Sequence, residues 1–407
     1  MSLTEHRMVG AGPVEDAGRR FDDLRGEHTI VKVEEPERAY WMVLGHDLTR
    51  ECLQNPSAFS SDVITPLNQD PPFKMIPIQL DPPEHTRWRR LLARYFSPRQ
   101  MALLRPRLEQ RTRELVAEIK QKGECDYVSE FALQFPTVVF LEMMGLPVDE
   151  LPRFLEWEKL ALAPSADGTF DADRQAAGIL SVVGYFQAAI ARTRDGGEHG
   201  DELLSQTTAW ELDGVPISDD VLVNCCLLLF LAGLDTVAMS LAFAMYHLAT
   251  HDADREHVAA VAAAGGSMDE IVEEMLRFYA VPEIGRKVVH DMEIDCHRLR
   301  AGELVLFPLV AGNRDDALVA GADHVDLRRG RTTPHLAFGG GPHRCLGSHL
   351  ARIEMNIALR GWHEAVPVYR LAHGATPRAY WSNVHGLMEL RLSGFGEACS
   401  ERREGAG

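Results

Sequence analysis

One stretch of the chain, residues 338–354, restricts the possible structures more than any other. Its three consecutive glycines, Gly339 to Gly341, allow the backbone to turn tightly and to pass close to a flat ligand. Cys345 follows, and apolar residues then recur at helical spacing up to Ile357, which predicts that a helix begins at or just after the cysteine. Free amide hydrogens and the positive end of a helix dipole would favour the thiolate form of Cys345.

A thiolate in a glycine-rich loop could act as a nucleophile, a redox group, a zinc ligand or an axial haem ligand. A zinc site needs further ligands, and only His343 and His349 lie near Cys345, with no Cys-x-x-Cys anywhere in the chain. Zinc is therefore disfavoured. A nucleophilic cysteine needs a base, which either histidine could supply, so the local sequence leaves that alternative open.

The complete motif around Cys345 fits fewer kinds of site than the cysteine and its two histidines do. The spacing Phe-x-x-Gly-x-x-x-Cys-x-Gly is present, and it resembles the haem-binding signature of the cytochrome P450 family. This resemblance implies haem b as the cofactor, with Cys345 as the axial ligand of its iron. The other cofactor-binding residues expected in this stretch are Phe338, Gly339, His343 and Gly347.

A second motif lies at a predicted helix start, where prolines precede Glu84. His85 and Arg89 are four residues apart, so they share a helical face and could grip one anionic group together, although a solvated basic face has the same spacing. In the cytochrome P450 family a matching His-x-x-x-Arg holds a haem propionate, and the resemblance implies this role for both residues. It also implies that Arg286 binds a propionate. Arg87, Arg90 and Arg94 do not all share that face and could instead be exposed where an electron donor docks.

Residues 219–250 are apolar nearly all round, which predicts one long helix through the interior. Asp235 and Thr236 lie within it, and buried polar groups need partners. One explanation is that Thr236 bonds back to the carbonyl of Ala232. Alternatively, Gly233 and Thr236 face the same way and leave a groove in which dioxygen fits.

The resemblance favours the second explanation, because the pair matches the acid and alcohol of the family's oxygen-binding helix, especially in soluble bacterial members of the camphor-hydroxylase type. It implies catalytic roles for Gly233, Asp235 and Thr236, with the last two managing proton delivery. The residues expected to face the substrate are Leu228, Ala232, Val281, Ile284, Val384 and His385.

Glu274 and Arg277 lie three residues apart in another predicted helix, and such pairs are common on surfaces. Their interval before the cysteine loop matches the family's Glu-x-x-Arg, which together with a later arginine locks the fold beneath the haem. The resemblance implies this structural role for Glu274 and Arg277, with Arg329 as their partner.

The composition excludes several other classes of protein. At 407 residues and 45% hydrophobic content, the chain can bury a large core. A formal net charge of −18 argues against nucleic-acid binding, which needs a basic face. Seven scattered cysteines and no visible export signal indicate a cytoplasmic protein. Asn224 and Asp235 interrupt the only membrane-like run, so no membrane span is expected.

We therefore expect a mainly α fold with small β-sheets, a single domain over residues 1–407 and a β-rich part at about 25–75. Within that part, residues 29–33 and 40–44 flank Glu35-Pro36-Glu37 and predict a hairpin. By resemblance, haem lies between the long central helix and the helix after Cys345. The expected protein is a monomeric monooxygenase of an apolar small molecule, which uses O2.

The resemblance implies that electrons come ultimately from NAD(P)H through a separate ferredoxin or flavodoxin and its reductase. One alternative is a peroxygenase that uses hydrogen peroxide, although Asp235 and Thr236 weigh against it. Another is a non-catalytic haem carrier or sensor. A scaffold without haem would leave the cysteine loop unexplained.

Overall fold

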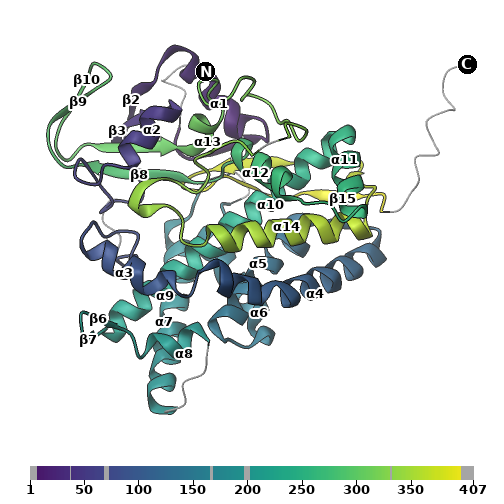
Figure 1. Ribbon diagram of the computed structural model, residues 1–407, viewed down its shortest axis with the longest axis horizontal. Helices are drawn as coiled ribbons and strands as arrows, with labels where there is room; N and C mark the ends of the chain where they lie inside the picture. The colour runs from purple at the N-terminus through teal and green to yellow at the C-terminus, as the bar shows by residue number, and fades with distance from the viewer. Residues whose placement is uncertain are drawn as a thin grey trace, which may run out of the picture.

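Helices are the main elements of the protein, and the strands form small sheets. The sheet containing β2 (Ile30–Glu35), β3 (Arg38–Val43) and β8 (Glu283–Val288) lies at the upper left of Figure 1, while β6 (Glu211–Leu212) and β7 (Val215–Pro216) lie at the lower left. This computed structural model describes residues 7–36, 38–67, 73–165, 168–196, 202–330 and 332–395. The prediction of a mainly α fold with small β-sheets is confirmed.

The largest sheet joins strands from near the N-terminus to strands from much later in the chain. Its order is β2 (Ile30–Glu35), β3 (Arg38–Val43), β11 (Leu304–Pro308), β8 (Glu283–Val288) and β4 (Phe59–Ser60). Ile30 lies opposite Val43 in an antiparallel pair, which confirms the two predicted strands, while Glu37 in the predicted turn lies outside the described residues. The expected β-rich region at about 25–75 is thus only one part of this sheet, because β8 and β11 complete it.

The other strands of the described chain form four smaller sheets. One contains β1 (Gly10–Pro13), β13 (Arg378–Trp381) and β14 (Gly386–Leu387), and another contains β12 (Arg370–Leu371), β15 (Arg391–Ser393) and β5 (Glu124–Asp126). The remaining two pair β9 (Met292–Ile294) with β10 (His297–Leu299), and β6 (Glu211–Leu212) with β7 (Val215–Pro216). Gly10 pairs with Trp381, so the first of these sheets brings distant parts of the chain together.

The α-helices of the described chain follow one another on both sides of the long apolar segment at 219–250. The helices before it are α1 (Asp16–Glu27), α2 (His46–Leu53), α3 (Glu84–Ala93), α4 (Pro98–Lys122), α5 (Gln134–Met144), α6 (Leu151–Leu162), α7 (Ala172–Gly196) and α8 (Leu203–Thr207). The segment itself forms α9 (Asp219–Gly233) and α10 (Asp235–Thr250), and α11 (Asp252–Ala263), α12 (Asp269–Phe278), α13 (Leu309–Asn313) and α14 (Ser348–Ala365) follow. Short turns of other helix types lie at Val128–Ala132, Val148–Glu150 and Gly341–His343.

The expected single helix over residues 219–250 is in fact two helices that meet at Leu234, where the backbone has φ −94° and ψ −65°. The Thr236 hydroxyl donates a hydrogen bond of 2.9 Å to the carbonyl of Ala232, and bonds of this kind bend helices. Within the described residues this segment is the one stretch long and apolar enough to cross a membrane, and 61% of its most apolar window is buried inside the protein. It is therefore explained as a core helix.

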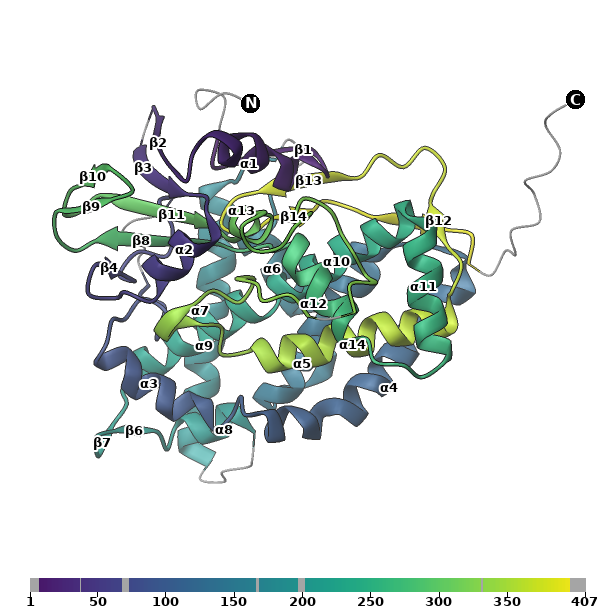
Figure 2. The same ribbon diagram turned by 45° about the horizontal axis from the view of Figure 1, so that its top comes forward.

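Helix α14, which follows the cysteine loop, lies in the middle of the helical part. It packs along α4 on one side and contacts α10, α11 and α12 on the other. Figure 2 shows α14 between α4 and α12. Since α10 also contacts α14, the helix containing Asp235 and the helix after Cys345 are neighbours in the core.

Candidate functional site

The loop from Phe338 to Gly347 presents Cys345 from a tightly closed turn. The Cys345 amide donates a 2.8 Å hydrogen bond to the carbonyl of Phe338, which closes the loop. Gly341 has φ +63°, and a Cβ at this position would collide with the carbonyl oxygen of Leu53, so only glycine fits. Helix α14 begins at Ser348, three residues after the cysteine, which confirms the predicted position of the helix.

The protein environment raises the pKa of the Cys345 thiol, contrary to the expectation from its place before a helix. Burial is the largest cause, and the Gly347 amide and the neighbouring arginines oppose it only in part. The side chain is nevertheless accessible although it lies deep in the protein, as expected of a residue on the wall of an internal cavity. Metal ligation deprotonates a thiol outright, so the raised pKa does not disfavour an iron ligand.

The residues expected to bind propionates gather from three parts of the chain. His85 and Arg89 come from α3, Arg286 from β8 and His343 from the cysteine loop, and the two histidine rings stack with centroids 3.8 Å apart. Nδ1 of His85 and Nε2 of His343 are buried without a hydrogen-bond partner. Arg286 is also buried, and its Nη1 donates to the carbonyl of Gly285 at 2.7 Å.

These groups have a surplus of positive charge without a bonded carboxylate. Among the described residues neither Arg89 nor Arg286 forms an ion pair, and burial lowers the pKa of Arg286 to about 10. Burial and the nearby cations lower the pKa of His343 to about 2 and that of His85 to about 4, so both histidines are neutral at pH 7. A buried cation requires an anionic partner. Two haem propionates would supply this charge, so the donor set fits a haem.

The junction between α9 and α10 exposes a short stretch of backbone in an otherwise largely buried segment. Gly233 and Ala232 are exposed there, and a Cβ on Gly233 would meet no atom within 4 Å. Thr236 is half-buried, and its hydroxyl donates to the carbonyl of Ala232. This is the hydrogen bond that the first of the two explanations from the sequence predicted. The groove of the other explanation is also present, so the two are compatible.

Asp235 points into the protein rather than into this groove. Its side chain is buried and accepts a hydrogen bond from the hydroxyl of Tyr380 in β13. Burial raises the pKa of Asp235 to about 7, and the Tyr380 hydrogen bond opposes this rise. A second buried acid, Glu158 of α6, lies within electrostatic range of Asp235. The sequence contains no signal for Glu158, because no local pattern shows that it comes within electrostatic range of Asp235.

The pair Glu274 and Arg277 is a buried ion pair rather than a surface one. The Arg277 side chain has no exposed area and uses all five N–H donors, two of them on Glu274 at 2.7 and 2.9 Å. The other three donate to the carbonyls of Asn313, Ala322 and His324. Arg329 lies 3.5 Å from Glu274, so the three expected residues meet.

A neighbouring ion pair that the sequence did not reveal fastens the cysteine loop to α12. Arg352 of α14 donates from Nη2 to Glu273 at 2.8 Å, and its guanidinium lies 4.3 Å from the centre of the Phe338 ring. His335 contacts the same carboxylate at 3.1 Å. Together these contacts hold the segment before Cys345 against α12.

The residues expected to face the substrate fall into two groups. Leu228 and Ala232 are one helical turn apart on α9, and the Ile284 methyl lies 3.2 Å from the place of a Cβ on Gly339. Val384 is half-buried and pairs with Pro282. Of these four residues, Ile284 is shown beside the cysteine loop, and the substrate-facing role of the others stays a prediction.

The other two residues of this set are buried. Val281 accepts a backbone hydrogen bond from His385 through its carbonyl, and its place beside the substrate stays a prediction. His385 is bonded through Nε2 to Glu283 at 2.6 Å and lies 3.1 Å from Arg20. This buried network fixes the His385 ring and argues against its predicted place in the substrate pocket.

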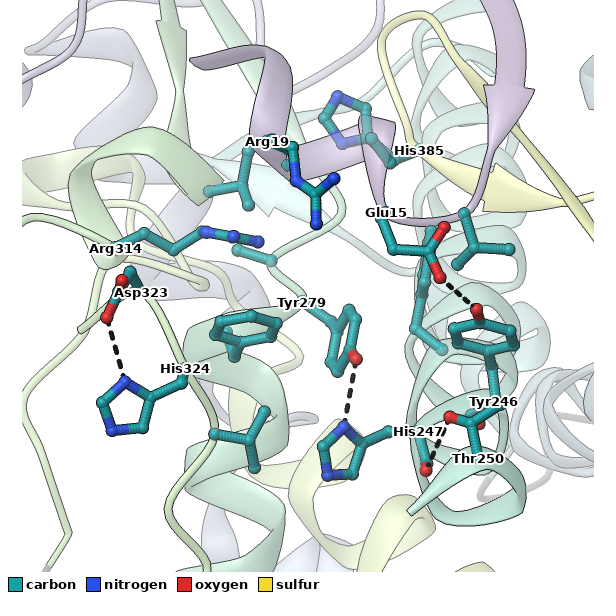
Figure 3. Close-up of a pocket in the computed structure, with 18 of the residues that line it drawn as sticks. Glu15, Arg19, Tyr246, His247, Thr250, Tyr279, Arg314, Asp323, His324 and His385 are labelled. Atoms are coloured by element: carbon teal, nitrogen blue, oxygen red, sulfur yellow. Dashed lines mark hydrogen bonds and ion pairs between the residues drawn. The ribbon is translucent and has the colours of Figure 1, made fainter. Parts of the chain in front are cut away.

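A separate hollow of about 440 Å³ opens between α1, α10, the end of α12 and α13. Figure 3 shows its polar wall, where Tyr246 donates to Glu15 and His247 bonds to the Tyr279 hydroxyl at 3.2 Å. His385 is the one residue that it shares with the expected site. This hollow therefore has no part in the site around Cys345.

Comparisons with known proteins agree with this geometry. The family model described as Cytochrome P450 matches residues 267–361. The chain is 34% identical over 369 residues to Cytochrome P450-SOY of Streptomyces griseus, and the aligned region covers 88% of this chain and 86% of that protein. It is 31% identical over 415 residues to the cytochrome P450 monooxygenase PikC of Streptomyces venezuelae, covering 96% and 97%.

The crystal structure of CYP101J2 is also similar, with a TM-score of 0.84 and 26% identity over 95% of this chain and 96% of that one. The similarity to both sequences and to this structure extends over nearly all of the chain. The chain belongs to the cytochrome P450 family and is a haem-thiolate monooxygenase.

Proposed function

We propose that this enzyme activates O2 and hydroxylates or epoxidises a small-to-medium apolar substrate. The observation that carries the proposal is the break at Leu234, which leaves Gly233 open beside the Thr236 hydroxyl while Asp235 stays buried behind it. A non-catalytic haem carrier would not need an acid and an alcohol at this place. The apolar residues Leu228, Ala232, Ile284 and Val384 support an apolar substrate.

Haem b, when bound, supplies the oxygen chemistry. Cys345 would hold the iron through Sγ, and Arg89, Arg286, His85 and His343 would hold the two carboxylates. Charge-assisted hydrogen bonds of this kind are strong, and they would replace the missing partners of the buried Arg286.

The chain's own residues hold and move the protons. With a pKa of about 7, the Asp235 carboxyl gains and loses a proton readily at neutral pH, which suits a general acid. Thr236 keeps a free oxygen lone pair while its hydrogen bonds to Ala232, so it can accept one hydrogen bond in the groove.

Electrons are proposed to come ultimately from NAD(P)H through a separate ferredoxin or flavodoxin and its reductase. Arg90 of α3 and Arg94, which caps the C-terminal end of that helix, are exposed. Arg89 of α3 donates to the carbonyl of the exposed Arg344, next to Cys345. An acidic donor would meet positive charge on this otherwise acidic chain. A monomeric, single-domain and cytoplasmic enzyme is part of the same proposal.

The test is the absorption spectrum of the dithionite-reduced protein with carbon monoxide, before and after apolar compounds are added. A strongly red-shifted Soret band that is lost in Cys345→His supports the thiolate ligand. A band of the histidine-ligated type in the intact protein would overturn it. NADH-dependent product formation with a ferredoxin and its reductase then separates a monooxygenase from a peroxygenase, which needs only peroxide.

A further inference from the structure

Three buried polar side chains from distant parts of the chain meet beside β8. Arg20 of α1, Glu283 of β8 and His385, just before β14, are 5%, 4% and 2% exposed. Nη2 of Arg20 lies 2.6 Å from Oε1 of Glu283, and Nε2 of His385 lies 2.6 Å from the same oxygen. We call these residues the Arg20–Glu283–His385 network. The proposed reaction uses none of them directly.

The positions of the hydrogens in this network follow from its geometry. A guanidinium group can only donate, so Arg20 donates to Glu283. The carboxylate oxygen can only accept, and His385 therefore carries a hydrogen on Nε2. Arg20 and His385 are 3.1 Å apart because both donate to one oxygen, not because they bond to each other. Burial lowers the pKa of His385, so its ring is neutral at pH 7 and Nδ1 carries no hydrogen.

The network reinforces the attachment of the turn after β13 to the segment that enters β8. The backbone amide of Glu283 donates to the carbonyl of Asn383 at 2.9 Å, and the amide of His385 donates to the carbonyl of Val281 at 2.8 Å. Val384 is the residue between these two attachment points. Because the side chains of Glu283 and His385 are also bonded, both the backbone and the side chains hold Val384 in place.

The opposite face of β8 is turned to the cysteine loop. Successive residues of a strand point to opposite faces, so Ile284 and Arg286 lie on the face away from Glu283. The Ile284 methyl lies 3.2 Å from the place of a Cβ on Gly339. Arg286 is the buried cation that a haem carboxylate would pair. The bonds to Glu283 therefore hold a strand whose other face reaches the site around Cys345.

We propose that the Arg20–Glu283–His385 network positions Ile284 and Val384 and thereby determines which apolar molecules fit beside the haem. Contacts between apolar groups have no preferred direction, so they do not fix the two side chains by themselves. Hydrogen bonds are directional, and the network supplies two of them to one carboxylate oxygen. Its members are positioning residues, because they act through Ile284 and Val384. The bonded arrangement is independent of the proposed function, whereas its effect on selectivity rests on that function.

The position of the hydrogen on His385 tests the network itself. Nitrogen NMR of protein labelled at its histidine rings, in the diamagnetic ferrous carbon monoxide complex at pH 7, shows which ring nitrogen is protonated. The signals of His385 are those absent from His385→Gln. Nε2 should carry the hydrogen and exchange it slowly with water, because the ring is buried. An Nε2 without a hydrogen would overturn the network, whatever the protein catalyses.

Two ligands of the ferric haem iron test the selectivity without turnover. Imidazole and phenylimidazole both bind the iron through nitrogen, but only the second has an apolar ring that reaches the pocket wall. His385→Leu removes one donor and leaves Glu283 paired with Arg20, so no buried charge loses its partner. It should weaken phenylimidazole binding by about 10-fold relative to imidazole, as a small misfit in an apolar pocket does. His385→Gln places an amide donor near Nε2 and should restore most of the difference.

The matched control is His363, which is equally buried and bonds to the Leu359 carbonyl and to Tyr369, away from β8. His363→Leu should lower stability but leave the ratio of the two affinities unchanged, as loss of a merely structural histidine does. His385→Asn is a second variant, because it keeps a polar group but its shorter amide does not reach Glu283. A wild-type affinity ratio in either folded variant, His385→Leu or His385→Asn, would overturn the positioning role.

Discussion

Replacement of Glu274 by glutamine tests how the structure beside the cysteine loop is held together. Arg277 has no exposed area and donates twice to the Glu274 carboxylate. A glutamine amide offers one oxygen, and its NH2 group would face an N–H of Arg277. The substitution therefore leaves a buried guanidinium charge without compensation, and Arg329 at 3.5 Å adds a second positive charge.

The cost of breaking a buried ion pair in this way is about 3–5 kcal/mol. A typical domain has a free energy of unfolding of about 5–15 kcal/mol, so the variant should lose a large share of its stability. The backbone amide of Asp326, which donates to Glu274 at 2.9 Å, and the three carbonyls bonded to Arg277 should loosen at the same time. Haem retention should fall with them, because this segment leads into the cysteine loop.

Urea unfolding followed by circular dichroism measures the free energy, and the haem spectrum measures retention. The matched control is Glu270→Gln on the same helix, where the side chain is exposed and the change should stay within about 0.5 kcal/mol. A Glu274→Gln protein within about 1 kcal/mol of the wild type would refute the reasoning, since the pair would then contribute no more than a surface salt bridge does.

Three other substitutions test the site. Asp235→Asn should have the same stability relative to the wild type at every pH well below 3.8, where the acid is protonated whether folded or unfolded. Between pH 4 and 7 the wild type loses stability because only the unfolded acid, with a pKa near 3.8, gives up its proton, so at pH 8 the variant should be the more stable by at most about 4 kcal/mol in chemical denaturation. Thr236→Ala should bind haem and substrate normally but divert reducing equivalents to peroxide; full coupling of NADH to product would contradict its role. Arg286→Gln should release haem faster to apomyoglobin than the exposed control Arg90→Gln, and equal rates would remove Arg286 from the carboxylate site.

Short-range signals in the sequence determined much of this protein. The glycines before Cys345 and the apolar spacing after it predicted the loop and the start of α14, because both depend on backbone freedom and on which residues share a helical face. The four residues around the expected propionates were named from their motifs, and the structure brings them together.

Tertiary structure alone decided the features that depend on burial and on pairing between distant segments. The pKa of Cys345 is raised because the loop is buried, although its place before a helix favours the thiolate. His385 is bound to Glu283 rather than turned to the substrate. Glu158 lies within electrostatic range of Asp235, although 77 positions of sequence separate them. No local sequence pattern specifies contacts between distant segments, because long-range packing decides which faces of the elements touch. The same packing sets the local dielectric, which shifts the pKa of a buried group.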